Sequence, residues 1–175
     1  AQLTATGQIR ERTEIRAGFG TLQKKGEKTA LFNLQRARLN LGYSGYRFKV
    51  FTALQDVRVW GQDASSINRT TTEVNNGVLL HEAWGEISLI DTLSTIQNMS
   101  VKIGRQQISY DDQKVLGGLD WLQQGRRHDA IVFKYANKGW IADVGVAFNQ
   151  NKELSSGTIY NGTNPAYGAG TNGIG

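Results

Sequence analysis

The 175 residues contain no cysteine, a single proline and no long apolar run, and each of these absences excludes a class of protein. Without cysteine there is no disulfide framework, no thiolate metal site and no cysteine nucleophile. The longest apolar runs, such as 130–133, fall far short of the roughly 18 to 20 residues that a membrane-spanning helix needs. Helical membrane proteins are therefore excluded, and the lack of proline favours a chain that keeps its backbone N–H groups for a β-ladder.

The chain also lacks a strong excess of charge of one sign. The 20 Lys and Arg against 15 Asp and Glu give a net charge of +5, and the densest basic stretch, 24–28, is interrupted by Glu27. This distribution argues against nucleic acid as a partner. No signal-peptide pattern opens the chain, so we expect either that none existed or that it was removed before Ala1. Aromatic and β-branched residues spread along the chain indicate a folded protein rather than a disordered one.

Alternation of polar and apolar residues predicts β-strands along most of the chain. The clearest case is 140–149, where Val144 and Val146 alternate with smaller or polar residues. The predicted strands cover 8–19, 30–43, 46–59, 78–89, 100–108, 128–136 and 140–149. Within 46–59 the alternation slips near Gln55 and Asp56, which predicts a β-bulge there.

The connections between these strands alternate in length. The long ones are 18–29, 61–77, 109–127 and the stretch from 150 onward, and the short ones are 44–45, 90–99 and 137–139. In an up-and-down sheet every second connection lies at the same edge, so one rim would carry the long loops and the other the short turns. This asymmetry is typical of outer-membrane barrels, which have tight periplasmic turns and long external loops.

The two faces of the predicted strands differ, because one is apolar and the other is charged. In a soluble β-sandwich the apolar faces would share a packed core, and periodicity alone does not distinguish the two folds. Aromatic residues flank two short turns: Tyr43, Tyr46 and Phe48 at one, and Phe133, Tyr135 and Trp140 at the other. Such girdles lie where hydrocarbon meets head groups, so we predict an all-β, antiparallel, up-and-down transmembrane β-barrel.

Seven predicted strands are an odd number, whereas single-chain bacterial barrels close with an even number. An unclosed sheet would also leave bare edges, which lipid cannot satisfy. We therefore expect residues 1–175 to be an incomplete part of a single, larger outer-membrane β-barrel domain.

Seven short motifs follow one another along the chain. They are Arg10 to Arg16 (RERTEIR), Gln35 to Leu39 (QRARL), Gln55 to Gly61 (QDVRVWG), Gly104 to Gln106 (GRQ), Tyr110 to Asp112 (YDD), Asp120 with Trp121, and Arg127 to Ala130 (RHDA). Their order and spacing resemble the N-terminal part of the alginate export porin family. The resemblance implies a monomeric barrel of about eighteen strands in the outer membrane of a Gram-negative bacterium, with a lumen that carries an anionic polysaccharide outward.

The charged face of the strands would line the lumen. The candidate pore-lining residues are Arg10, Arg12, Glu14, Arg16, Arg36, Arg38, Arg47, Lys49, Asp56, Arg58, Glu82, Glu86 and Arg105. Arginine presents a fixed fork of donors that matches a carboxylate and keeps its charge. Rows of such weak sites would pass anionic or polar solutes, among them an acidic polysaccharide, by passive diffusion. Alternatively, these arginines pair with the acids and only solvate a wide lumen.

Two other functions stay open on the sequence alone. The barrel could serve as a membrane anchor or scaffold subunit of a larger envelope complex, with protein partners bound by the long external loops. The chain could also be a soluble β-sandwich binding module. Whether it is a channel or an anchor, the barrel would be surrounded by outer-membrane lipid.

No enzyme activity, cofactor or metal is predicted. A catalytic pairing of His128 with Asp129 is disfavoured, because adjacent residues of a strand point to opposite faces. Asp111, Asp112 and Asp120 do not follow the spacing of a calcium loop. We expect these carboxylates to pair with cations of the same loop, namely Lys114, Arg126 or Arg127.

Overall fold

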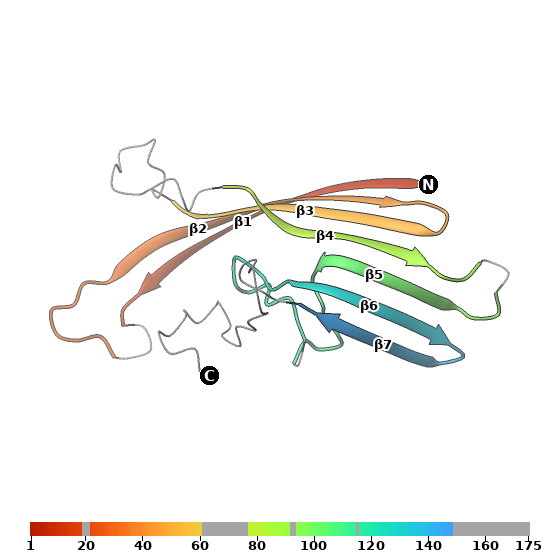
Figure 1. Cartoon of the computed structure of the whole chain (residues 1–175). Helices are drawn as coiled ribbons and strands as arrows, with labels where there is room; N and C mark the ends of the chain where they lie inside the picture. Colours follow the sequence, from red (N-terminus) through yellow and green to blue (C-terminus); the bar gives the residue numbers. More distant parts are fainter. Residues whose placement is uncertain (19–21, 61–76, 92–93, 115, 149–175) are drawn as a thin grey trace, which may run out of the picture.

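A computed structural model describes residues 1–18, 22–60, 77–91, 94–114 and 116–148. These residues form seven strands: β1 (Gln2–Arg16), β2 (Ala30–Ser44), β3 (Phe48–Val59), β4 (Leu79–Ser88), β5 (Asn98–Gln106), β6 (His128–Asn137) and β7 (Trp140–Ala147) (Figure 1). Among them, no helix is long and apolar enough to cross a membrane. Most of the predicted loop 61–77 and the stretch from 150 onward lie outside the described residues.

All seven strands belong to one sheet, in the order β1-β2-β3-β4-β5-β6-β7, and each neighbouring pair is antiparallel. This confirms the predicted all-β, up-and-down topology. No second sheet covers either face within the described part of the chain, so the β-sandwich alternative finds no support. Strands β1 and β7 form the two edges of the sheet.

Six of the seven strands begin within two residues of the predicted position. Strand β1 is the exception, because it begins at Gln2 rather than at residue 8. The stretch from Gln2 to Gly7 consists mostly of small and polar residues and alternates weakly, yet all of it pairs with β2, from Ser44 to Leu39. Pairing with an established neighbour, rather than its own pattern, makes this stretch a strand.

The predicted bulge in β3 is wrong by position and by strand. Pairing between β2 and β3 runs unbroken from one end to the other. Against β4, however, Ala53 pairs with Glu82 whereas Leu54 pairs with Leu80, so His81 is the extra residue. The irregularity therefore lies in β4, where one additional residue is inserted and the local twist increases.

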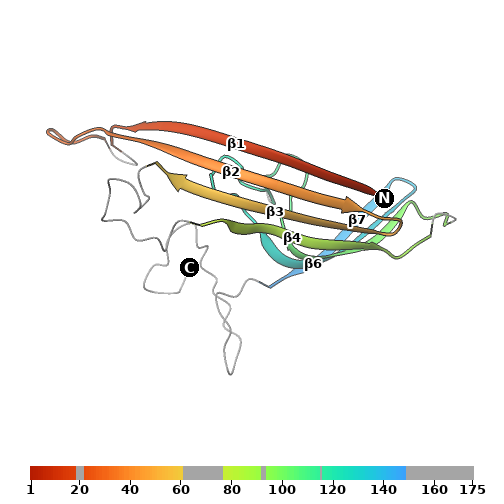
Figure 2. The same cartoon turned by 90° about the horizontal axis from the view of Figure 1, so that it is seen from above.

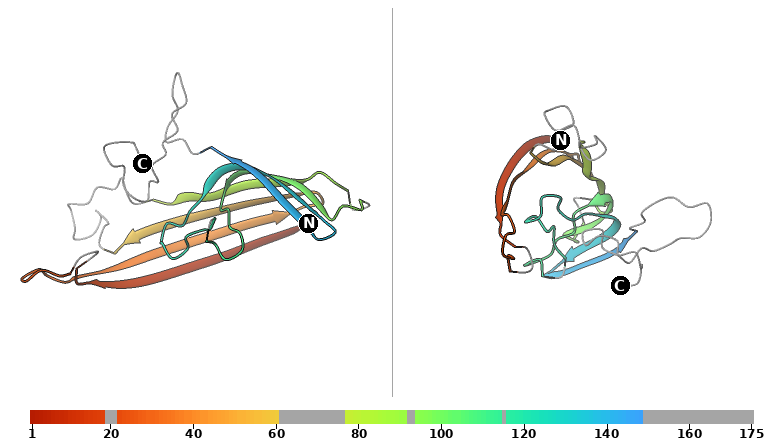
Figure 3. Two further views of the ribbon diagram at one scale, coloured as in Figure 1. Left: turned by 90° about the horizontal axis from the view of Figure 1, so that it is seen from below. Right: turned by 90° about the vertical axis from the view of Figure 1, so that its left-hand side faces the viewer.

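The sheet is curved, and the right-hand view of Figure 3 shows β1 to β7 as an arc with one concave side. The short turns β2–β3 and β6–β7 lie at one end of the strands, and the β1–β2 loop lies at the other (Figures 1 and 2). Lys138 and Gly139 close the β6–β7 turn with φ values of 46° and 83°, the conformation of a two-residue hairpin turn. The connection between β5 and β6 folds back into the concave side (Figure 3).

Candidate functional site

The concave face carries the densest set of charged side chains. Residues that pair across antiparallel strands point to the same face, and Arg10 pairs with Arg36 while Arg38 pairs with Gln55. We call the β5–β6 connection, residues 107–127 without residue 115, the inner segment. It accepts hydrogen bonds from these arginines, which places them on the concave side.

Nine of the thirteen predicted pore-lining residues lie on this face by register. They are Arg10, Arg12, Glu14, Arg16, Arg36, Arg38, Lys49, Glu82 and Glu86. Arg47 lies in the β2–β3 turn rather than in a strand, and its Nη2 donates to the carbonyl of Ser88 at 3.1 Å. The nine comprise six cations and three anions, so positive charge predominates among them.

The predicted position of Asp56, Arg58 and Arg105 is corrected by the register. Asp56 pairs with Ala37 and Arg105 pairs with Ala83, so these side chains lie on the convex face. Each arginine is paired there, Arg58 with Asp56 at 2.6 Å and Arg105 with Asp129 at 2.9 Å. The expected bulge near Gln55 and Asp56 places Asp56 and Arg58 on the polar face, and the prediction for Arg105 follows its charge rather than the alternation of its strand.

These charges mark one limit of an apolar band on the convex face. From Asp56 towards the start of β3, the outward residues are Leu54, Thr52, Val50 and Phe48. From Asp56 to Phe48 the strand rises about 27 Å, and a tilt of about 40° reduces this to about 21 Å along the barrel axis, near the roughly 25 Å band of outer-membrane barrels. Apolar residues of this face are widely exposed, for example Ile9 at 77% and Val146 at 69%.

The concave face is organised around Asp120 of the inner segment. Its carboxylate accepts a hydrogen bond from Arg36 Nη1 at 2.8 Å and lies 3.9 Å from Arg38 Nη1 and 4.0 Å from Arg10 Nη1. The Arg36 side chain is fully buried, and its Nη2 also donates to Gln8 Oε1 at 2.6 Å. One carboxylate thus meets three guanidinium groups from two strands, the arrangement we call the Asp120 cluster.

Backbone carbonyls of the inner segment occupy further arginine donors. Arg10 donates to the carbonyl of Asp120, and Arg12 donates to that of Trp121 at 2.7 Å. The side chain of Gln55 donates to the carbonyl of Gln124 at 3.0 Å. These contacts join β1 and β3 to a segment that begins and ends at β5 and β6. The inner segment therefore narrows the concave side at this height.

Two contacts near the start of the inner segment add to its attachment. The backbone N–H of Gln107 donates to Glu82 Oε2 at 2.9 Å, and Tyr110 Oη donates to Asp143 Oδ2 at 2.7 Å. Desolvation, together with the hydrogen bond to the Asp143 carboxylate, raises the pKa of Tyr110 to about 12. The phenol therefore stays protonated at physiological pH and keeps its donor role.

Docking of the inner segment is expected to depend on pH through Asp120. Burial alone would raise the pKa of this carboxyl, but the hydrogen bond from Arg36 and the charges of Arg36, Arg38 and Arg10 hold the pKa below its usual value. A lowered pKa in the folded state stabilises docking above the ordinary carboxyl pKa of about 3.9, and this contribution is lost as the pH falls further. A spin label on Gln124→Cys should thus gain mobility as the pH falls below about 4.

The same label provides the control for this prediction. Residues 1–175 contain no cysteine, so within them the label is unique, and Gln124 is exposed. In an Asp120→Asn background the label should already be mobile at pH 7 and should respond little to acid. Equal acid responses with and without the Asp120 carboxylate would contradict the assignment.

Sequence reasoning missed several residues of the concave face. Lys102 and Lys134 lie there by register, as do Phe51 and Trp84, and the alternation within their strands already carried this information. Asp120 was expected to pair within its loop, whereas its partners are on β1 and β2. Asp112 does pair within the loop, with Lys114 at 2.7 Å.

The described residues show no arrangement that supports catalysis by His128 with Asp129 or binding of calcium. His128 pairs with Gln106, and Asp129 pairs with Arg105, so the two side chains lie on opposite faces, as expected. Across the described ranges, no group of three or more His, Asp or Glu side chains is arranged to hold a metal ion.

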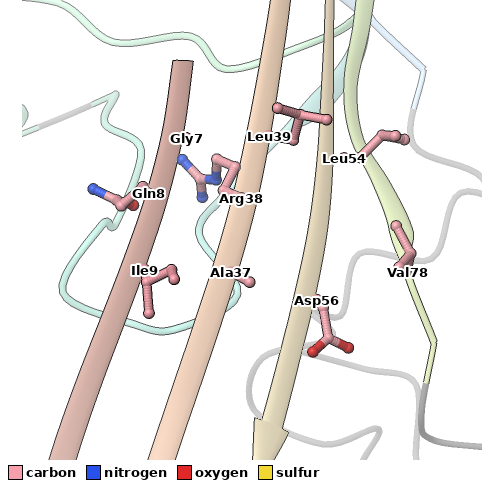
Figure 4. A pocket seen from close by; sticks show the side chains of 9 residues that line it. All are labelled: Gly7, Gln8, Ile9, Ala37, Arg38, Leu39, Leu54, Asp56 and Val78. Carbon is pink, nitrogen blue, oxygen red and sulfur yellow. The ribbon is translucent and has the colours of Figure 1, made fainter. Parts of the chain in front are cut away.

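A hollow of about 630 Å³ lies on β1 to β4 but is mainly apolar. Figure 4 shows it beside the small side chain of Ala37, between Ile9, Leu39 and Leu54, with Asp56 at its border. These residues belong to the convex face by register. The hollow therefore suits contact with hydrocarbon rather than passage of a polar solute.

An up-and-down antiparallel sheet with an exposed apolar convex face and an ionic concave face defines the class of outer-membrane β-barrels. Residues 1–147 match the family model described as Alginate export, and the chain therefore belongs to the alginate export family. This confirms the resemblance seen in the sequence. It is an outer-membrane porin family with a role in transport rather than catalysis. No curated protein and no solved structure matches the chain.

Proposed function

We propose that the chain forms part of the wall of a channel in the bacterial outer membrane. Anionic or polar solutes, with an acidic polysaccharide as the favoured substrate, would diffuse passively along its arginine-bearing concave face. Sequence membership in the alginate export family supports the substrate class. The nine residues placed on the concave face would be the pore-lining set.

The Asp120 cluster is the observation that carries this proposal. It places a carboxylate among three guanidinium groups on the wall, and this arrangement supports the proposal that the wall can receive a carboxylate. Guanidinium binds carboxylate through fixed, directional donors and keeps its charge at any physiological pH. A uronate residue of a passing polymer presents the same group. Several such sites of moderate strength allow a solute to enter and to leave.

The sheet edges support a larger barrel. The outer edges of β1 and β7 pair with no strand among the residues that the structure describes. Free backbone N–H and C=O groups are too costly in hydrocarbon, so spanning strands require a closed barrel. We therefore propose that these seven strands and further strands of the same protein form one barrel domain.

The proposal is tested by single-channel recording of the full-length protein in planar lipid bilayers. We expect ion currents that favour anions, and we expect oligomers of uronic acid to block them. Changing Arg10 and Arg12 to glutamine should shift the reversal potential towards cations, because both guanidinium groups lie part-exposed on the wall. Lys24 and Lys25, in the β1–β2 loop, offer a control pair whose change to glutamine should have a smaller effect.

The absence of ion currents in these bilayers would contradict the channel proposal. They would instead favour the anchor or scaffold function, in which the inner segment closes the concave side and the long loops bind protein partners.

A further inference from the structure

Two aromatic rings stack against each other on the concave wall. Phe51 and Trp84 are direct cross-strand partners on β3 and β4, with ring centroids 5.3 Å apart and an interplanar angle of 24°. Both are half-buried. Other strand aromatics, such as Tyr43 and Tyr135, lie on the convex face by register, where a membrane girdle explains them. A girdle does not explain the Phe51–Trp84 pair.

The flanking cross-strand partners of this pair are both glycines. On one side Phe51 pairs with Gly42, where an added Cβ would lie 2.6 Å from Thr4 Oγ1 and 3.7 Å from Phe51 Cδ2. On the other side Trp84 pairs with Gly104, which also lacks a side chain. The two stacked rings thus lie between two glycines. We call them the aromatic pair.

Charged side chains border the aromatic pair towards the short-turn end of the strands. Lys49, Glu86 and Lys102 form the next row across β3, β4 and β5. Lys102 Nζ lies 3.8 Å from the centroid of a Trp84 ring, a cation–π contact. The indole Nε1 of Trp84 is buried without a hydrogen-bond acceptor among the described residues. Two lysines and a carboxylate therefore border the aromatic pair on this side.

We propose that the aromatic pair is a saccharide-binding subsite on the channel wall, specific for pyranose rings that carry carboxylates. The C–H face of a pyranose is apolar, and its weakly positive hydrogens suit the negative face of an aromatic ring. Lys49 and Lys102 would bind the ring carboxylate at the border. This inference rests on the proposed channel function and adds a second kind of recognition, since the arginines bind charge whereas the aromatic pair binds the sugar ring.

The test compares two polyanions in bilayer recordings of the full-length protein. The first probe is an oligomer of mannuronic acid, and the second is an oligomer of glutamic acid with the same number of carboxylates but no sugar ring. Phe51→Leu and Trp84→Leu should each raise the half-blocking concentration of the uronate oligomer by about fivefold, corresponding to the loss of one aromatic contact. Block by oligoglutamate should change less than about twofold.

Matched variants separate loss of the ring from loss of the fold. Phe51→Tyr and Trp84→Phe keep an aromatic ring, so the uronate oligomer should block these variants as it blocks the wild type. Wild-type protein gives a further measurement, because an uncharged mannose oligomer should also block, although more weakly than the uronate. If the leucine variants do not fold, block of the wild type by the uncharged mannose oligomer decides whether the aromatic pair binds sugar rings.

Failure of the subsite and failure of the channel give different results. Equal shifts for both polyanions, no shift for either, or no block by the uncharged oligomer would overturn the aromatic subsite. If neither polyanion blocks the wild type, or if no current is seen, the channel proposal itself is overturned.

Discussion

Changing Arg36 to alanine is expected to release the inner segment and to lower the free energy of unfolding by about 2 to 3 kcal/mol. The Arg36 side chain is fully buried and donates to Asp120 at 2.8 Å and to Gln8 at 2.6 Å. Truncation would leave the Gln8 amide without this donor and the Asp120 carboxylate with only two more distant cations. Urea titration of the full-length protein in lipid vesicles measures the stability, and the spin label at position 124 reports release.

Arg16 provides the matched control for Arg36. It lies on the same face and pairs with Glu14 at 2.6 Å, but its side chain is 37% exposed. Exposed ion pairs contribute about 0 to 1 kcal/mol, so Arg16→Ala should cost much less than Arg36→Ala and should leave the inner segment docked. Similar losses for the two variants would show that burial of Arg36 is not what anchors the segment.

Changing Gly104 to alanine should have the other large effect and should prevent most of the protein from folding. Gly104 has a φ of +124°, which is unfavourable for any residue with a Cβ. An added Cβ would lie 2.3 Å from the carbonyl oxygen of Ala83 and 2.9 Å from the Cα of Trp84. Because both obstacles are backbone atoms of the adjacent strand, the ladder would have to separate, at a cost of at least about 3 kcal/mol.

Gly85, on the adjacent strand β4, is the control for this substitution. A Cβ there would meet only the carbonyl oxygen of Lys49, at 3.9 Å, an ordinary contact distance. Gly85→Ala should therefore fold normally, with a stability change within about 1 kcal/mol. The folded fraction of each variant is measured from the heat-dependent mobility of the barrel in detergent gels. Normal folding of Gly104→Ala would contradict the geometry.

Most of the sheet could be predicted from the sequence because every strand carries its own alternation, apart from the first six residues of β1. The turn at 137–139 likewise contains the glycine that its geometry requires. The first residues of β1 could not be predicted, because small and polar residues such as Thr4 and Gly7 give little contrast between the faces. Their pairing depends on β2, which local sequence does not encode.

The charged face was only partly predictable, for a different reason. Alternation shows which residues share a face, but it does not show where the apolar band ends. A charge that points outward above the band, such as Asp56 or Arg105, has the same pattern as one that points inward. Asp120 lies 84 positions from Arg36, so no local pattern could identify that contact.

The inner segment has a mechanical consequence for the curved sheet. It leaves β5 and returns to β6, yet its carbonyls and carboxylate are held by guanidinium groups of β1 and β2 on the opposite flank of the arc. Because the inner segment joins the two flanks of the arc, flattening the sheet would stretch these ionic contacts as well as bend the backbone. Side chains on the concave side therefore help to hold the curvature of this wall.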